Sequence, residues 1–128
     1  MVGKSLCGET DVNIVQEALA DQVYRIAPQG RLDAVTVPSL EAVVDEHLAA
    51  GHIRLVIDLA GVTYISSSGL RALLRARRQA QAGGGDVALC DMSARVTEVF
   101  DMIGFNNLFQ IFPRATDAAV ALAKVAAA

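Results

Sequence analysis

The chain has 128 residues, of which 53% are hydrophobic, with 11 Lys and Arg against 14 Asp and Glu. This length and apolar content are typical of a single domain that folds without disulfides or a structural metal. The formal net charge of −3 argues against nucleic acid or an anionic membrane surface as the partner. We therefore expect a protein or a small molecule as the partner.

The N-terminal segment shows no targeting signal. Residues 1–10 lack the apolar stretch of a signal peptide, and no apolar run approaches the roughly 18 to 20 residues of a membrane span. The two cysteines, Cys7 and Cys90, form no CxxC pair, so we expect reduced thiols and no zinc site. The sequence predicts a cytoplasmic protein without membrane insertion.

The first part of the chain predicts a hairpin followed by a helix. Apolar and polar residues roughly alternate over Val12–Pro28, which is typical of two short strands, and Gly30 ends this pattern. Thr36 is a candidate N-cap, and Pro38 fits the first turn of a helix. The apolar residues that follow have helical spacing, and Gly51 closes a helix of about four turns.

The middle of the chain predicts a buried strand and an amphipathic helix. The run Ile53–Leu59 is short and mostly apolar, as in a central strand that is buried on both faces. We expect a loop over Gly61–Ile65 and then a helix over Ser67–Ala82, whose leucines lie on one face and arginines on another. The run Gly83–Gly85 is a sharp helix stop.

The last part of the chain predicts two more strands and two more helices. Asp86–Cys90 has the pattern of a strand, and Ser93 caps a helix that ends at Gly104. Leu108–Phe112 is expected to be a short strand, and the alanine-rich segment Thr116–Val125 has high helix propensity.

The order of these elements predicts an α/β fold. We expect a mixed sheet of about five strands, with an N-terminal hairpin and parallel later strands, and about four helices. One domain spans residues 1–128, with its core at about 12–123. Residues 1–10 and 126–128 are expected to be flexible.

Three consecutive hydroxyl side chains, Ser66, Ser67 and Ser68, stand where a strand leads through a short loop into a helix. One serine is explained by N-capping, which contributes about 1 kcal/mol. A helix start at the carboxyl end of a parallel strand also favours an anion, so a phosphoryl group would be tolerated there. The residues alone leave both interpretations open.

The segment from Asp58 to Leu70 resembles the signature of the STAS family, which is best known from anti-sigma factor antagonists. Three other segments also resemble elements of this family: Gly30-Arg31-Leu32-Asp33, Gly83–Gly85 and Phe100–Phe105. The resemblance covers about Val12 to Ala123, nearly the whole chain. It implies the STAS fold.

In the antagonists of this family, a serine of the motif is phosphorylated by the anti-sigma factor, which is itself a serine kinase. Alignment without gaps on Asp58, Gly69 and Leu70 places that serine at Ser67, with Ser66 and Ser68 as alternative acceptors. Ser66 occupies the position of the family's aspartate, so a carboxylate is missing beside the acceptor.

The resemblance implies a partner switch. The unphosphorylated protein would bind an anti-sigma factor serine kinase and free the sigma factor, and phosphorylation would reverse this binding. A separate phosphatase would reset the switch. The implied contact surface comprises Asp33, Ser66, Ser67, Ser68, Gly69 and Arg71, and we expect a monomer. The alternative is a STAS subunit of a transporter or signalling scaffold, without a phosphorylation switch.

Two features of this surface have a purely structural alternative. Asp33 is either a partner contact or a loop residue that bonds its own backbone. The arginines of the second helix either meet an acidic partner or form a solvated face; they are Arg71, Arg75 and Arg78.

Nothing in the sequence predicts catalysis. The serine triplet lacks the GxSxG elbow, and neither His47 nor His52 stands where an α/β-hydrolase would have its late base. The two histidines have no neighbouring cysteine or HExxH pattern. We expect surface histidines, and no enzyme activity, cofactor or metal site.

Overall fold

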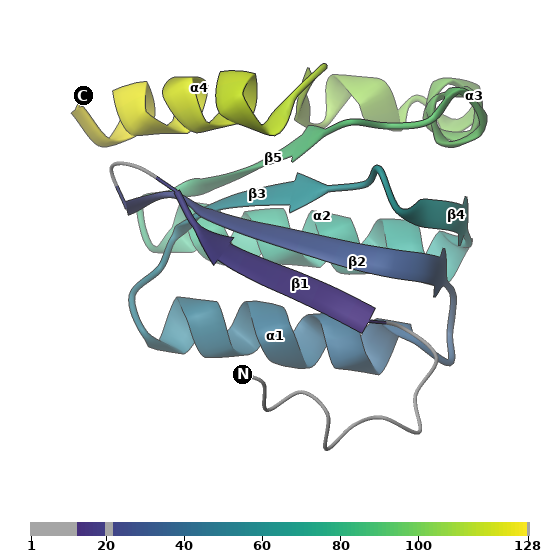
Figure 1. Ribbon diagram of the computed structural model, residues 1–128, viewed down its shortest axis with the longest axis horizontal. Coiled ribbons are helices and arrows are strands. Elements are labelled where there is room, and N and C mark those ends of the chain that lie inside the picture. Colours follow the sequence, from purple (N-terminus) through teal and green to yellow (C-terminus); the bar gives the residue numbers. More distant parts are fainter. Residues whose placement is uncertain (1–12, 20–21, 128) are drawn as a thin grey trace.

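The computed structural model describes residues 13–19 and 22–127. Within these residues, the chain forms six strands and four α-helices (Figure 1). The strands are β1 (Asn13–Ala18), β2 (Tyr24–Leu32), β3 (Arg54–Asp58), β4 (Val62–Ile65), β5 (Asp86–Cys90) and β6 (Gln110–Phe112). The helices are α1 (Val37–Ala49), α2 (Ser67–Ala82), α3 (Ala94–Ile103) and α4 (Ala115–Ala127), with a 3₁₀ turn at Phe105–Asn107.

The sheet is mixed, as the sequence predicts. Its strand order is β1-β2-β3-β5-β6, with β1 antiparallel to β2 and every other pair parallel. Strand β3 is the predicted central strand, and its residues Leu55–Asp58 are buried. The antiparallel hairpin and the parallel later strands confirm the predicted fold class.

Strand β4 occupies most of the segment that was expected to be a loop. It pairs in parallel with the second half of β2, whose first half pairs with β3. The partner of β2 changes between Ile26 and Gly30, and within the β4 pairing the register shifts between Gly30 and Arg31. The sheet therefore has six strands where about five were expected.

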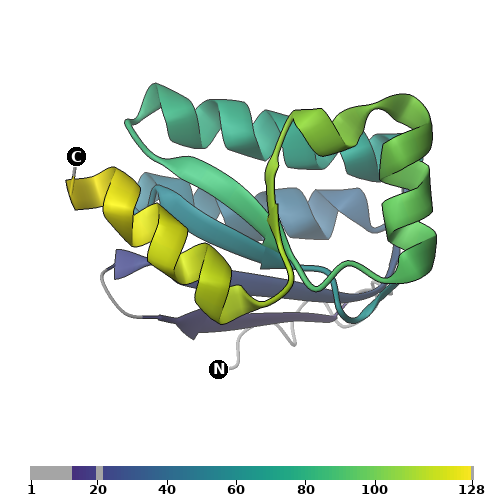
Figure 2. The same ribbon diagram turned by 90° about the horizontal axis from the view of Figure 1, so that it is seen from above.

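The helices cover the two faces of the sheet unequally. Figures 1 and 2 show α1 and α2 on one face and α4 on the other, while α3 lies at the end of the sheet beside β4. The larger apolar core lies under α1 and α2 and includes Ile26, Leu40, Leu73 and Phe100. A smaller core under α4 consists of Val23, Val56, Ala88, Cys90, Ala118 and Leu122.

The helix ends follow the predicted signals with one exception. The hydroxyl of Ser93 accepts from the Val96 N–H at 3.2 Å, and Gly104 ends α3 in the left-handed conformation. Thr36 is the N-cap of α1 by position, but its hydroxyl donates to the Arg31 carbonyl instead of capping the helix.

The other predicted boundaries differ only slightly. The last strand begins at Gln110 and not at Leu108, because Leu108 caps the preceding 3₁₀ turn. The expected flexibility of residues 1–10 concerns positions outside the described ones and stays a prediction. None of the helices in the described part is both long and apolar enough to span a membrane.

Two buried carboxylates tie the strands together. Asp58 accepts from the Arg25 Nε at 2.9 Å and thereby joins β3 to β2. Asp86 accepts from Arg77 and from Gln110, each at 2.9 Å, and thereby joins β5 to α2 and β6. Both acids are paired, which is the condition under which a carboxylate is buried at acceptable cost.

Candidate functional site: the serine end of the sheet

The serine triplet lies where β4 runs into α2, at the carboxyl end of the β2–β4 pair. Ser66 is the N-cap and has an extended backbone (φ −97°, ψ 176°). Its hydroxyl accepts from the Gly69 N–H at 3.4 Å, and its own N–H donates to the Leu32 carbonyl at 2.9 Å. The structural role predicted for one of the three serines therefore belongs to Ser66.

Gly69 sets how closely α2 approaches the end of β2. A Cβ atom at this position would lie 2.8 Å from the Ile65 side chain and 2.9 Å from the Leu32 carbonyl oxygen. Real Cβ atoms essentially never approach other atoms that closely. A glycine is required because the first turn of α2 is pressed against the strand, and this contact fixes the position of the neighbouring serines.

Ser67 is the first residue of α2, and it is exposed, whereas Ser68 is half-buried. Among the residues that the structure describes, no partner holds either hydroxyl. The triplet therefore divides into one capping serine and two serines with free hydroxyls. Of these two, Ser67 is the more accessible to an enzyme.

Asp33 follows β2 directly and lies in the turn before α1. Its carboxylate accepts from the backbone N–H groups of Val35 (3.1 Å) and Thr36 (3.3 Å) and pairs with Arg31 at 3.3 Å. Desolvation, the largest single influence, raises the pKa of Asp33, but the hydrogen bonds from Arg31, Thr36 and Val35 together lower it below its ordinary value. Asp33 is therefore a loop residue that bonds its own backbone, as one of the two alternatives expected.

The Ser66 N–H bond to Leu32 brings the serine triplet next to Asp33 in space. Sequence reasoning missed three further residues here. Arg31 lies over the ring of Tyr64 with its guanidinium carbon 4.4 Å from the ring centroid, and these residues face each other across the β2–β4 pair. Val35, in the Asp33 turn, is 69% exposed. Of these three, only Arg31 has a signal in the sequence, because alternation along β2 places it opposite in direction to buried Leu32.

The electrostatics of this end favour an anion. The first turn of α2 contains no acidic residue, and Arg71 lies exposed one turn after Ser67. The free N–H groups of a helix start and its dipole attract negative charge. The arrangement can accept a phosphoryl group on Ser67, but no described base or carboxylate activates the hydroxyl as a nucleophile.

In the described part of the chain, one group of three acidic or thiol side chains lies close enough together to share a metal ion. It comprises Asp58, Cys90 and Asp91, whose ligand atoms lie within 4.8 Å of one another. Arg25 already neutralises Asp58. Burial, followed by the charge of Asp58, raises the pKa of the Cys90 thiol far above its ordinary value, so the thiolate that a metal needs is disfavoured.

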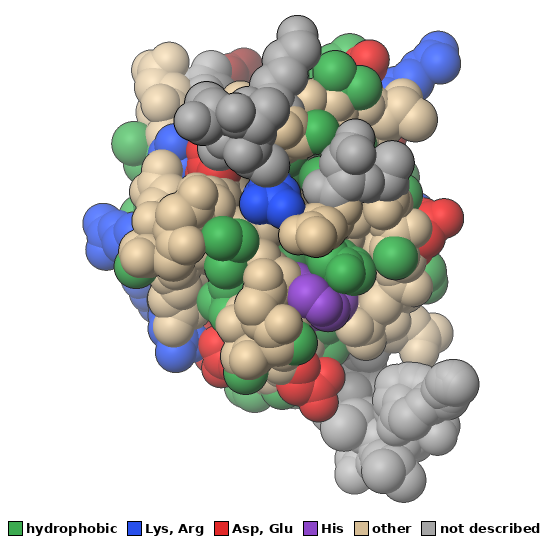
Figure 3. Space-filling model, turned by 90° about the vertical axis from the view of Figure 1, so that its left-hand side faces the viewer, with side chains coloured by type: hydrophobic (Ala, Val, Ile, Leu, Met, Phe, Trp, Pro, Cys, Tyr) green, Lys and Arg blue, Asp and Glu red, His purple; other side chains and the backbone are tan. Residues whose placement is uncertain are grey.

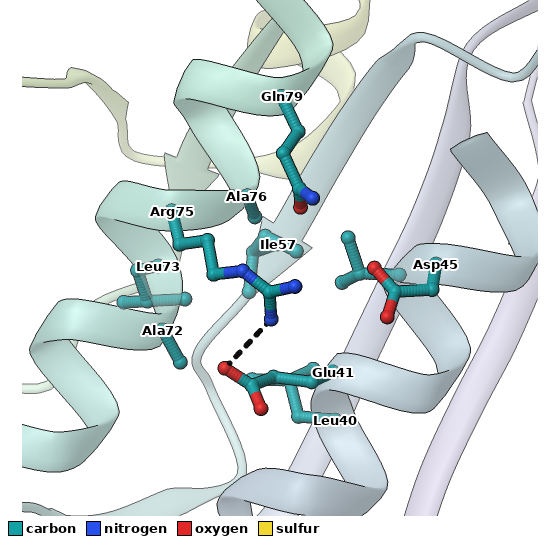
Figure 4. Close-up of a pocket in the computed structure, with 10 residues that line it drawn as sticks. Leu40, Glu41, Asp45, Ile57, Ala72, Leu73, Arg75, Ala76 and Gln79 are labelled. Carbon is teal, nitrogen blue, oxygen red and sulfur yellow. Dashed lines mark ion pairs between the residues drawn. The ribbon is translucent and has the colours of Figure 1, made fainter.

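A small pocket lies between α1 and α2, away from the serines (Figure 4). Arg75 reaches across it and pairs with Glu41 at 3.1 Å, as the dashed line marks. Of the three arginines expected to meet an acidic partner or to form a solvated face, Arg75 therefore joins the two helices, while Arg71 and Arg78 are exposed. The pocket has apolar walls formed by Leu40, Val44, Ile57, Leu73 and Ala76, and the polar side chains of Asp45 and Gln79 also line it.

Comparison with known proteins places the chain in a family. The family model of the STAS domain matches residues 16–118. A Bordetella bronchiseptica protein named as an anti-sigma factor antagonist, BtrV, is 35% identical over 98 residues, which are 77% of this chain and 84% of that protein.

Solved structures share the fold. A Thermotoga maritima protein described as an anti-sigma factor antagonist superposes with a TM-score of 0.79 at 20% identity, covering 85% of this chain and 93% of that one. The Bacillus cell fate determinant SpoIIAA, solved in its phosphorylated form, gives a TM-score of 0.67 at 19% identity and covers 85% of this chain and 98% of its own. The match of the family model over most of the chain and the similarity to BtrV show that this protein belongs to the STAS domain family.

Proposed function

We propose that the protein is an anti-sigma factor antagonist, a non-enzymatic regulator that acts by binding other proteins in the cytoplasm. The observation that carries this proposal is the exposed Ser67 hydroxyl at the start of α2, beside a capping serine that leaves it free. The name of BtrV and the descriptions of the structurally similar proteins support the same assignment.

The partner of the unphosphorylated form is an anti-sigma factor serine kinase. The contact surface is the serine end of the sheet, with Asp33, Ser66, Ser67, Ser68, Gly69 and Arg71. The exposed apolar groups of Val35 and Tyr64 enlarge it, since Tyr64 is 41% exposed beside the serine loop. An apolar patch with a few polar groups is typical of a protein-binding surface.

Phosphorylation of Ser67 opposes this complex. A phosphoryl group adds about −1.5 to −2 charges at a surface that the partner must desolvate. A penalty of about 2.7 kcal/mol weakens binding roughly a hundredfold. Within the chain itself the group is tolerated, because the helix start and Arg71 are complementary to it. A separate phosphatase then resets the switch.

The replacement of the family's aspartate by Ser66 does not disable the site in physical terms. Serine and aspartate are comparable N-caps, and the Ser66 hydroxyl makes the capping bond. What is missing is one negative charge beside Ser67. The acceptor position is therefore intact, and the absence of this carboxylate removes a source of repulsion toward the phosphoryl group.

Phosphate transfer tests the proposal directly. Incubation with the cognate anti-sigma factor kinase and ATP is expected to add one phosphate, detected by intact-mass spectrometry. Ser67→Ala should abolish the transfer, and Ser68→Ala, a matched change one residue away, should preserve it. Transfer that persists in Ser67→Ala would refute Ser67 as the acceptor.

Binding tests the second half of the proposal. Titration calorimetry should show that the unphosphorylated chain binds the anti-sigma factor and that the phosphorylated chain binds at least tenfold more weakly. Equal affinity of the two forms would refute the switch. No phosphate transfer together with stable binding to another protein would support the scaffold or transporter-subunit alternative.

A further inference from the structure

The end of α1 has a backbone geometry that brings two histidines together. Gly51 has a φ of +86°, its N–H donates to the Leu48 carbonyl at 3.0 Å, and the N–H of His52 donates to the His47 carbonyl at 2.8 Å. This is the Schellman pattern of helix termination, in which the residues at the positions of His47 and His52 normally make an apolar contact. Here both positions carry imidazoles.

The two imidazoles are held in place from both sides. Their Nδ1 atoms lie 2.9 Å apart, and the Nε2 of His47 lies 2.8 Å from the Oε1 of Gln16 on β1. The ring of His52 stacks on Tyr24 of β2, with 3.8 Å between centroids and 10° between planes. An amide oxygen only accepts, so the Nε2 of His47 carries the proton, and its Nδ1 accepts the hydrogen bond that the Nδ1–H of His52 donates.

We propose that His47 and His52 form a binding site for one first-row transition-metal ion, Ni²⁺ or Cu²⁺, through their Nδ1 atoms. Imidazole nitrogens bind such metals at about 2.0 to 2.1 Å, so two of them at adjacent corners of a square plane lie about 2.9 Å apart. The observed 2.9 Å is the length of the hydrogen bond between the two rings, and a bound metal ion would replace the proton that they share while the nitrogens stay about as far apart. Water supplies the remaining positions.

Gln16 completes the site from behind. A metal-binding histidine typically donates its other ring N–H to an oxygen, which fixes the ring and its tautomer. Gln16 does this for His47 across 31 positions of sequence. The His47 ring is therefore held in place without the metal, and the proton between the two Nδ1 atoms must leave when a metal binds.

Access also suits a metal ion. Both histidines are partly exposed, and histidine side chains reach the surface in the middle of the face shown in Figure 3.

This site is separate from the serine end. The two lie at opposite ends of α1, whose 13 residues span about 20 Å. The inference therefore does not depend on the proposed regulatory function, and it goes against the expectation from the sequence that the histidines are unrelated surface residues.

Titration of the untagged chain with NiCl₂ in a non-coordinating buffer at pH 7.5 tests the proposal. Calorimetry should show saturable binding of one Ni²⁺ per chain. His47→Gln and His52→Gln should each weaken it at least tenfold, because one nitrogen ligand is lost. Asp91→Asn, in the only other candidate cluster among the described residues, should leave the affinity unchanged.

X-ray absorption at the nickel edge should show two imidazole ligands in the wild type. Circular dichroism and metal-free thermal unfolding check that the variants fold. The proposal is overturned by the absence of saturable binding to the wild type, or by a loss smaller than tenfold in either histidine variant. It is equally overturned by a loss in Asp91→Asn as large as in the histidine variants.

Discussion

The two ends of the sheet hold their polar residues in opposite ways. At the serine end, backbone groups and one glycine fix the loop, and the Ser67 hydroxyl is left without a partner among the described residues. At the histidine end, side chains hold one another: Gln16, His47, His52 and Tyr24 form one connected group. The backbone contacts at the serine end leave the Ser67 hydroxyl available for modification. At the histidine end, the side-chain contacts hold His47 and His52 close enough to share a ligand.

The largest expected change in the free energy of unfolding comes from a glycine at the histidine end, where two backbone segments pack closely. A Cβ on Gly85 would lie 1.9 Å from the Ile53 carbonyl oxygen, so Gly85→Ala should reduce the free energy of unfolding by about 3 kcal/mol or more. Gly84→Ala is the matched control, because it enters open space. Its φ of +95° should cost about 1 kcal/mol. Urea denaturation that ranks Gly84→Ala as the more damaging change would contradict this.

The same test at the serine end has a smaller expected effect. Gly69→Ala adds a Cβ against Leu32 and Ile65, with an overpacking cost of about 1 to 3 kcal/mol. A gain of about 1 kcal/mol in helix propensity offsets part of it. We expect a lower midpoint in urea and weaker binding to the anti-sigma factor. A more stable Gly69→Ala variant would show that α2 does not need this close approach.

Adjacent serines should respond in opposite ways. Ser66→Ala removes the cap of α2 and should lower the free energy of unfolding by about 1 kcal/mol. Ser67→Ala should change it by less than about 0.5 kcal/mol, because the side chain is exposed. Thermal unfolding measures both, and phosphate transfer should be lost only in Ser67→Ala. Equal stability losses would mean that the division of roles within the triplet is wrong.

The smallest effect is the pH dependence of the histidine end. Burial, and then the charge of His52, lower the pKa of His47 below its ordinary value, so the unfolded chain binds more protons than the native one at mildly acidic pH. Its contribution to stability is present above about pH 6.5 and is lost as the pH falls below that value. The unfolding midpoint should therefore drop less steeply between pH 7 and 5 in His47→Gln than in the wild type. If the unfolding midpoint falls equally steeply with pH in both proteins, His47 does not cause the pH dependence.

Most of the fold could be predicted from local sequence signals. The helix over Ser67–Ala82 has the predicted bounds, because its serine start and glycine stop are local. The cap at Ser93 and the left-handed end at Gly104 were equally visible. The buried run before Asp58 indicated the central strand, since a strand covered on both faces is continuously apolar.

The features that were missed depend on contacts between distant residues. Strand β4 is only four residues long, and its pairing with β2 joins segments about 30 positions apart, which no local pattern shows. For the same reason, the sequence could not reveal that Gln16 meets His47. Thr36 stands at the N-cap position, but its hydroxyl donates to the Arg31 carbonyl and accepts from the Asp33 N–H in the nearby turn.

The change of partner along β2 has a consequence for the length of the chain between Asp58 and Ser67. Strands β3 and β4 lie in parallel on the same edge of β2, one after the other, and the Gly30 N–H donates to the Gly61 carbonyl at 2.8 Å between them. Pairing with β2 on both sides of this loop therefore fixes how many residues the segment can contain. Inserting one residue after Leu59 would turn every β4 side chain to the opposite face, and Ser67 would no longer reach the surface at the same place.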